Sequence, residues 1–309
     1  MREIGGGLRP GSRPRASVAV LTAAALVAVA GVAGCEEPAP ATRSGPSGKP
    51  PRPSSSPTPL WDRSPASLAA VGDSITRGYD ACAVFADCPE ASWATGTDTA
   101  VRSVALRLLG AAGATRRAWN HARSGARMSE LPAQMTAAAA RRPELVTVMV
   151  GANDACRDSP ARMTPVADFR RSFTEAMRSL RSTAPKAQVY VSSVPDLKRL
   201  WATGRTDPLG REIWKFGICA SMLKDADDVG PAAQARRAEV YERVVAYNAV
   251  LEDVCTKDLL CRYDGGDVFA FGFTGGQLSR WDWFHPNRNG QEQLAEIAYR
   301  NITAPEPRR

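Results

Sequence analysis

The chain has 309 residues, of which 40 are basic and 32 acidic, so its formal net charge is +8. The basic residues are scattered rather than interleaved with aromatic side chains, so the composition does not indicate a nucleic-acid-binding surface. The length accommodates one α/β domain together with additional segments.

The first 34 residues predict a secretory signal peptide. Four arginines form a basic start, and residues 17–33 are an uninterrupted run of apolar or small side chains. The run ends in the tetrapeptide VAGC at residues 32–35, which resembles a bacterial lipobox. We expect cleavage before Cys35 and lipidation of Cys35, with an ordinary signal peptide and a coincidental cysteine as the alternative. The cleaved chain would carry a net charge of +5.

Residues 35–59 would then be a lipidated cysteine followed by a spacer. The spacer is rich in Pro and Ser and has no apolar periodicity, so it cannot bury enough surface to fold. Its proline content favours an extended conformation. We therefore expect a folded domain at residues 60–309, extracellular and anchored to the outer face of the bacterial cell membrane.

Six cysteines remain after Cys35, and an even number in an exported protein predicts three disulfides. Six cysteines allow 15 pairings. We favour the sequential pairs because two of them close small loops: Cys82–Cys88, Cys156–Cys219 and Cys255–Cys261. A metal site is disfavoured, since there is no Cys-x-x-Cys and the two histidines are remote from any paired cysteines. We expect no metal and no cofactor.

Short apolar runs alternate with helical patterns along the domain. We expect strands at residues 68–71, 115–120, 144–150 and 188–192, and helices at 99–109, 129–141 (capped by Ser129), 166–183, 235–257 and 287–300. This alternation predicts an α/β fold with a mostly parallel sheet of about five strands, covered by helices on both faces. Residues 195–231 lack clear periodicity and are too long for a plain connection, so they predict an insertion near the site.

Four short blocks follow or flank these elements. They read GDSIT at residues 72–76, NHARSG at 120–125, GAND at 151–154 and DWFHP at 282–286. Taken in this order, the blocks resemble those of the GDSL/SGNH hydrolase family, and the resemblance spans roughly residues 68–299. It implies a three-layer αβα, flavodoxin-like fold and hydrolysis of carboxylic esters. Similarity to secreted actinobacterial members with three disulfides favours lipid or simple acyl esters.

The residue types in these blocks fit nucleophilic catalysis. A serine hydroxyl is a poor nucleophile and needs a base, for which His285 is the natural candidate. Asp282 lies three residues before His285, so one turn can bring its carboxylate to Nδ1 while Nε2 faces Ser74. The Gly-Asp-Ser turn also predicts a capped helix start whose free N–H groups surround Ser74.

The resemblance implies three donors for a developing oxyanion: the backbone N–H of Ser74, the backbone N–H of Gly125 and the side-chain amide of Asn153. Asp73 and Asp154 are expected to have structural roles. Each block residue also has a simpler interpretation, as a turn glycine, an Asx turn or a loop histidine.

Other candidates are weaker. We interpret His121 as a strand-end residue, because the family pattern does not specify its position. The insertion carries large apolar residues that could form a lid, but packing under a long loop is the commoner outcome: Trp201, Trp214, Phe216 and Met222.

The sequence thus predicts an extracellular serine esterase or lipase, with a small-molecule or lipid ester as substrate. We expect a monomer that contacts the membrane through its lipid anchor and binds no nucleic acid. The alternatives are a carbohydrate O-deacetylase of the same fold and a non-catalytic binding lipoprotein that keeps the fold.

Overall fold

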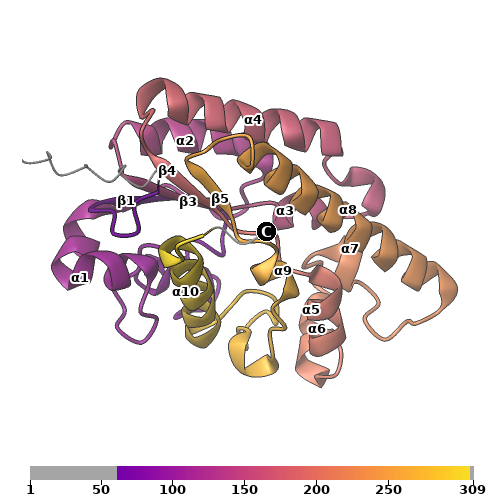
Figure 1. Cartoon of the computed structure of the whole chain (residues 1–309). Coiled ribbons are helices and arrows are strands. Elements are labelled where there is room, and N and C mark those ends of the chain that lie inside the picture. Colours follow the sequence, from indigo (N-terminus) through magenta and orange to yellow (C-terminus); the bar gives the residue numbers. More distant parts are fainter. Residues whose placement is uncertain (1–60, 307–309) are drawn as a thin grey trace, which may run out of the picture. The chain divides into compact units, whose positions relative to one another are not determined.

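The computed structural model describes residues 61–306. The predicted signal peptide, Cys35 and the spacer lie outside these described residues. The centre of the domain is a five-stranded parallel sheet with the strand order β2-β1-β3-β4-β5 (Figure 1). The strands are β1 (Leu68–Gly72), β2 (Ala118–Asn120), β3 (Leu145–Met149), β4 (Gln188–Val191) and β5 (Cys261–Tyr263). The predicted α/β fold is confirmed.

Helices cover both faces of this sheet. On one face α2 (Leu131–Ala139), α4 (Val166–Thr183) and α8 (Pro231–Cys255) pack side by side, and on the other lie α1 (Val104–Arg117) and α10 (Arg288–Thr303) (Figure 1). Every residue of β1, β3 and β4 is buried, which explains why these strands read as continuous apolar runs. The shorter elements are α3 (Ala152–Ala155), α5 (Leu197–Gly204), α6 (Pro208–Trp214), α7 (Ala220–Leu223), α9 (Asp267–Ala270), η1 (Pro89–Ala91), η2 (Met128–Glu130), η3 (Pro160–Arg162) and η4 (Gly275–Gln277).

Several predicted boundaries were wrong. The first helix begins after the Ser103 cap, later than expected. Gly110, with a φ of +67° and a ψ of 173°, interrupts it as predicted, and a second helical piece follows this kink and runs to Arg117. The following strand is therefore confined to β2. Ser129 does not cap α2, because it lies inside the short 3₁₀ turn η2. Helix α8 begins four residues earlier than expected, at Pro231, a favoured first-turn residue.

The insertion at residues 195–231 contains the three short helices α5, α6 and α7 rather than an irregular loop. Trp201, Trp214 and Met222 are buried in it, as expected for packing, whereas Phe216 is 87% exposed. No helix within residues 61–306 combines the length and the apolar character needed to cross a bilayer.

The three disulfides pair as predicted: Cys82–Cys88, Cys156–Cys219 and Cys255–Cys261. Two of them close loops of six residues, and the second bridges 63 residues of sequence. The long-range bridge joins the residue after α3 to the residue before α7, so it ties the insertion to the end of β3.

Candidate active site

Ser74 lies just beyond the carboxyl end of β1, where the chain turns sharply. Gly72 has a φ of +147°, and a Cβ there would lie 2.1 Å from the carbonyl oxygen of Met149, so this close approach of β1 to β3 requires glycine. The expected helix after Ser74 is absent from the described structure. Consecutive turns follow instead, because Gly78 and Asp80 adopt positive φ angles that a helix cannot contain.

Ser74, His285 and Asp282 form a continuous hydrogen-bonded chain. His285 Nε2 lies 2.8 Å from Ser74 Oγ, and His285 Nδ1 contacts Asp282 Oδ2. Ser74 and Asp282 are buried, at 7% and 3% exposure. The structure therefore brings Ser74 to a histidine 211 positions later and to the aspartate three positions before it, as the blocks predict.

The Asp282 carboxylate also holds the loop that carries it. Its Oδ1 accepts the backbone N–H groups of Phe284 and His285 at 2.9 and 3.0 Å. Burial acts to raise the pKa of Asp282, but the hydrogen bond and positive charge of His285 and these two N–H groups outweigh it, so the pKa lies below its ordinary value. The indole of Trp214 in the insertion donates to the Asp282 carbonyl oxygen at 3.1 Å.

The expected oxyanion donors follow three neighbouring strands. Ser74 comes after β1, Gly125 after β2 and Asn153 after β3, and β1 lies between the other two in the sheet. Within the described chain, the backbone N–H groups of Ser74 and Gly125 donate to no protein acceptor. One Asn153 amide hydrogen is donated to the Ala126 carbonyl oxygen at 3.0 Å, which leaves the second for a ligand.

These residues line one open cleft. Its walls are Ser74, Tyr79, Phe85, Ser124, Gly125, Asn153, Ile218, Asp282 and His285. The sequence did not identify Tyr79, Phe85 or Ile218, because nothing in the local pattern shows that two loops approach the serine. A second, mostly apolar pocket contains no residue of the cleft wall, although Ile75 and Phe284 in its lining are sequence neighbours of Ser74 and His285. We therefore assign the ligand to the cleft.

Two buried carboxyls support the turns around the site. Asp73 Oδ1 accepts the Ile75 N–H at 3.0 Å, and Asp154 Oδ2 accepts the Met128 N–H at 2.8 Å. Burial raises the pKa of Asp73 to about 7 and that of Asp154 to about 6. His121 contributes to no wall of the cleft, and burial lowers its pKa. These positions agree with the structural roles that the sequence predicted.

Two groups of side chains in residues 61–306 are close enough to bind a metal ion. One is Cys82, Cys88 and Glu90, but its cysteines are oxidised to a disulfide and offer no thiolate. The other is Asp80, Asp282 and His285, but both nitrogens of that imidazole already face Asp282 and Ser74. The donor atoms therefore fit a hydrogen-bonded catalytic group better than a metal centre.

The chain is similar to a known protein family and to several solved structures. The model of the GDSL-like lipase/acylhydrolase family matches residues 70–293. No curated protein matches the chain significantly. Similar solved structures include the esterase EstA from Pseudoalteromonas sp. (16% identity, 77% of this chain and 96% of that one, TM-score 0.43) and an extracellular lipase from Streptomyces rimosus (18%, 77% and 99%, 0.43).

A family two carbohydrate esterase from Clostridium thermocellum is similar at the same level (16% identity, 76% of this chain and 63% of that one, TM-score 0.41). Structural likenesses of this strength do not distinguish one substrate from another. The family model spans most of the chain and contains all four sequence blocks. The chain therefore belongs to the GDSL-like lipase/acylhydrolase family.

Proposed function

We propose that this protein is a serine hydrolase that cleaves carboxylic esters through an acyl-enzyme. The observation that carries the proposal is the 2.8 Å contact between Ser74 Oγ and an imidazole whose other nitrogen is held by a buried carboxylate. The same constellation activates serine nucleophiles on unrelated folds.

In the first step Ser74 Oγ attacks the ester carbonyl carbon while His285 Nε2 accepts the hydroxyl proton. Asp282 holds the Nδ1–H tautomer and stabilises the imidazolium that forms. The negative charge on the carbonyl oxygen is received by the free N–H groups of Ser74 and Gly125 and by the Asn153 amide. The bond to the alcohol then breaks, and His285 returns its proton to the leaving oxygen.

In the second step a water molecule attacks the acyl-enzyme. His285 accepts a proton from this water, and the acid is released with return of the proton to Ser74. No step requires a metal or an organic cofactor.

The wall of the cleft supports an ester with an apolar portion. Phe85 is 67% exposed and Ile218 is half-buried, and both line the cleft together with Tyr79. Exposed apolar side chains at a binding site lose water when an acyl chain covers them. No tryptophan lines the cleft, and an exposed tryptophan is the feature that would favour a carbohydrate substrate. We therefore favour lipid or simple acyl esters over a carbohydrate O-deacetylase.

The place of action is part of the proposal. A lipidated Cys35 and the spacer after it would hold a monomeric domain at the outer face of the cell membrane, with the membrane as its only macromolecular partner. Labelling of cells with a palmitate analogue should mark the full-length chain and fail to mark Cys35→Ser. Equal labelling of both chains would contradict lipidation at this residue.

The activity is tested with aryl esters of graded acyl length, using the full-length protein and Ser74→Ala. We expect turnover by the wild type that increases with acyl length over at least the first few carbons, and none by the variant. Fluorophosphonate labelling gives a second readout, with Ser124→Ala as the matched control because Ser124 also lines the cleft. Labelling of wild type and Ser124→Ala but not Ser74→Ala would support the proposal. Equal labelling of all three would contradict it.

A further inference from the structure

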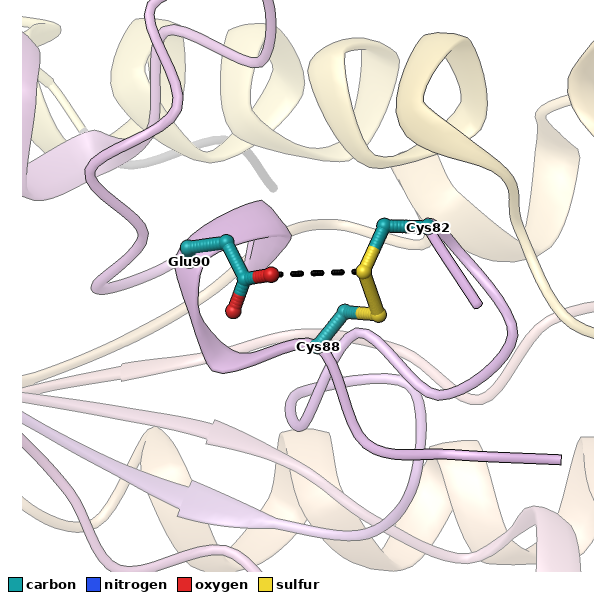
Figure 2. A group of neighbouring side chains, drawn as sticks. All are labelled: Cys82, Cys88 and Glu90. Carbon is teal, nitrogen blue, oxygen red and sulfur yellow. Dashed lines mark hydrogen bonds between the residues drawn. A yellow bond between two sulfur atoms is a disulfide. The ribbon is translucent and has the colours of Figure 1, made fainter. Parts of the chain in front are cut away.

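A small loop next to the triad is closed by a disulfide. We name residues 80–88 the disulfide loop, because the Cys82–Cys88 bond closes it. Figure 2 shows this bond together with Glu90, whose carboxylate oxygen lies 3.3 Å from the Cys82 sulfur. The loop begins at Asp80, which has a φ of +57°. It also carries Phe85, which lines the cleft.

Asp80 fixes the base of this loop from inside the protein. Its backbone N–H donates to the Ala86 carbonyl oxygen at 3.0 Å, and its Oδ1 accepts the Phe85 N–H. The other carboxyl oxygen, Oδ2, is buried and accepts no hydrogen bond from a protein N–H or O–H in the described chain. A carboxyl oxygen buried in this way is costly unless the group is protonated or faces a compensating charge.

The Asp80 carboxyl lies next to the catalytic pair. One oxygen of Asp80, one oxygen of Asp282 and one ring nitrogen of His285 all lie within 4.8 Å of one another. Asp80 is fully buried and Asp282 is 3% exposed, so little water screens the two carboxyls. The ring of Tyr79 packs against His285 with centroids 4.9 Å apart, so the residue before Asp80 also contacts the base.

We propose that Asp80 is a positioning residue that acts through Asp282, donating its O–H toward that carboxylate when neutral and adding a second negative charge next to His285 when ionised. This inference rests on the proposed esterase function, because it assigns Asp80 a role in the same triad. The negative charge of ionised Asp80 would stabilise the positively charged imidazolium that His285 forms as Ser74 attacks. The disulfide loop thus sets the strength of the catalytic base as well as forming a wall of the cleft.

The surroundings of Asp80 shift the ionisation of its carboxyl toward the pH range in which the enzyme is expected to act. Burial first, and then the negative charge of Asp282, raise the pKa of Asp80 to about 6, while the charge of His285 opposes this shift. The titratable or charged groups nearby are Asp282, His285 and Tyr79, and on the exposed side of the same segment the ion pair of Arg77 with Asp87. The second charge would therefore appear as the pH rises toward neutrality, where the enzyme also needs a neutral imidazole.

Three variants distinguish the proposed electrostatic role of Asp80 from a purely structural role in the disulfide loop. Asp80→Asn keeps an oxygen for the Phe85 N–H but can never carry the charge, whereas Asp80→Ala loses both. Glu90→Gln is the matched control, because it removes an exposed carboxylate next to the same disulfide. All variants are made in the full-length protein, and their melting temperatures are measured alongside activity.

The experiment records kcat and KM for an aryl ester, and the rate of fluorophosphonate labelling, between about pH 4.5 and 9. We expect Asp80→Asn to lower kcat by about tenfold near pH 8 without raising KM, and to move the acid limb of the profile to lower pH. Glu90→Gln should follow the wild type. A wild-type profile in Asp80→Asn would overturn the proposal. So would a loss of activity that merely parallels a loss of melting temperature in both Asp80 variants. If the wild type itself is not labelled, the esterase assignment fails instead.

Discussion

The oxyanion donors and the catalytic base are held in different ways. Ser74, Gly125 and Asn153 follow three adjacent strands, so their positions are fixed by the hydrogen bonds of the sheet. Asp282 and His285 lie on a segment between η4 and α10, outside any strand of the sheet. That segment is held by a local backbone bridge, in which Ser279 N–H donates to the His285 carbonyl oxygen at 2.7 Å, and by the Asp282 carboxylate.

Because of this difference, we expect activity and stability to be linked on the Asp282/His285 side of the site but not at the strand ends. Removing a donor at a strand end leaves the sheet intact, so activity should fall while stability hardly changes. Removing Asp282 takes away both the orientation of His285 and the acceptor of two loop N–H groups. We therefore expect the base side of the site to lose activity and stability together.

Substitution of Asp282 should have the largest effect. In Asp282→Asn the amide would donate to Nδ1 and favour the wrong tautomer of His285, so kcat should fall about 10⁴-fold. The remaining oxygen can still accept the Phe284 and His285 N–H groups, so the fold should persist. Asp282→Ala should lose the same activity and in addition about 1–3 kcal/mol of unfolding free energy. Kinetics and urea denaturation of both variants test this.

The exposed Asp227 offers a control for the loss of a carboxylate, because its side chain is 71% accessible. Asp227→Asn should retain wild-type kinetics and stability. If Asp282→Ala were as stable as Asp282→Asn, other contacts would hold the loop. The expectation that activity and stability fall together on this side of the site would then be contradicted.

Removal of individual disulfides tests how stability and activity are linked in two other parts of the domain. The chain-entropy model gives about 4 kcal/mol for a bridge of this span at Cys156–Cys219 and about 2 kcal/mol for the six-residue loop at Cys82–Cys88. Paired Cys→Ser variants, measured by urea denaturation, should follow this order. The loop closed by Cys82–Cys88 carries Phe85 and Asp80. Removal of this disulfide should therefore change kcat and KM more than its small contribution to the free energy of unfolding suggests. Equal destabilisation by both pairs would contradict the model.

Loss of Asn153 should isolate the strand-end side of the site. Asn153→Ala removes one oxyanion donor, so kcat should fall about 10²- to 10³-fold with KM nearly unchanged. The half-buried amide also donates to Ala126, but this single bond is a small part of the turn. The melting temperature should therefore stay close to that of the wild type. An increase in KM with unchanged kcat would show instead that Asn153 binds the ground state.

The sequence predicted the parts of the site whose signals are local. A glycine or asparagine a few residues after a strand, and an aspartate three residues before a histidine, are short patterns with a physical reason. Ile218 escaped notice because only long-range folding brings its loop to Ser74. Tyr79 and Asp80 follow Ser74 closely in sequence, but in a run of turns that the expected helix did not anticipate.

The limits of the fold prediction have the same origin. Strand β5 has three residues and contains Arg262, so it shows no apolar run, and its place in the sheet depends on pairing with β4. Gly110 interrupts α1, as its local preference predicts, but the second helical piece up to Arg117 covers residues that the sequence assigned in part to a strand. Boundaries set by tertiary packing are not visible in a local pattern.

The smallest effect on kcat is expected from Asp73, whose ionisation should instead make stability depend on pH at the strand-end side. Asp73 has a pKa of about 7 in the folded protein against an ordinary value of 3.8, because it is buried. The folded state therefore binds more protons than the unfolded state between about pH 4 and 7, and the contribution of Asp73 to stability falls as pH rises through this window. Asp73→Asn keeps an oxygen for the Ile75 N–H but lacks the ionisation. Relative to the wild type it should gain at most about 1.4 kcal/mol per pH unit across this range.

Asp154→Asn provides a parallel measurement, since Asp154 has a pKa of about 6. The pH-dependent loss of stability caused by Asp154 should therefore end about one pH unit lower than that caused by Asp73. Urea denaturation of wild type and both variants at several pH values tests the order. A difference between Asp73→Asn and wild type that is constant with pH would mean that Asp73 ionises in the folded state as it does in the unfolded chain. The turn that presents Ser74 would then carry a full negative charge beside the nucleophile, and the sheet would have to hold that charge as well as the donors.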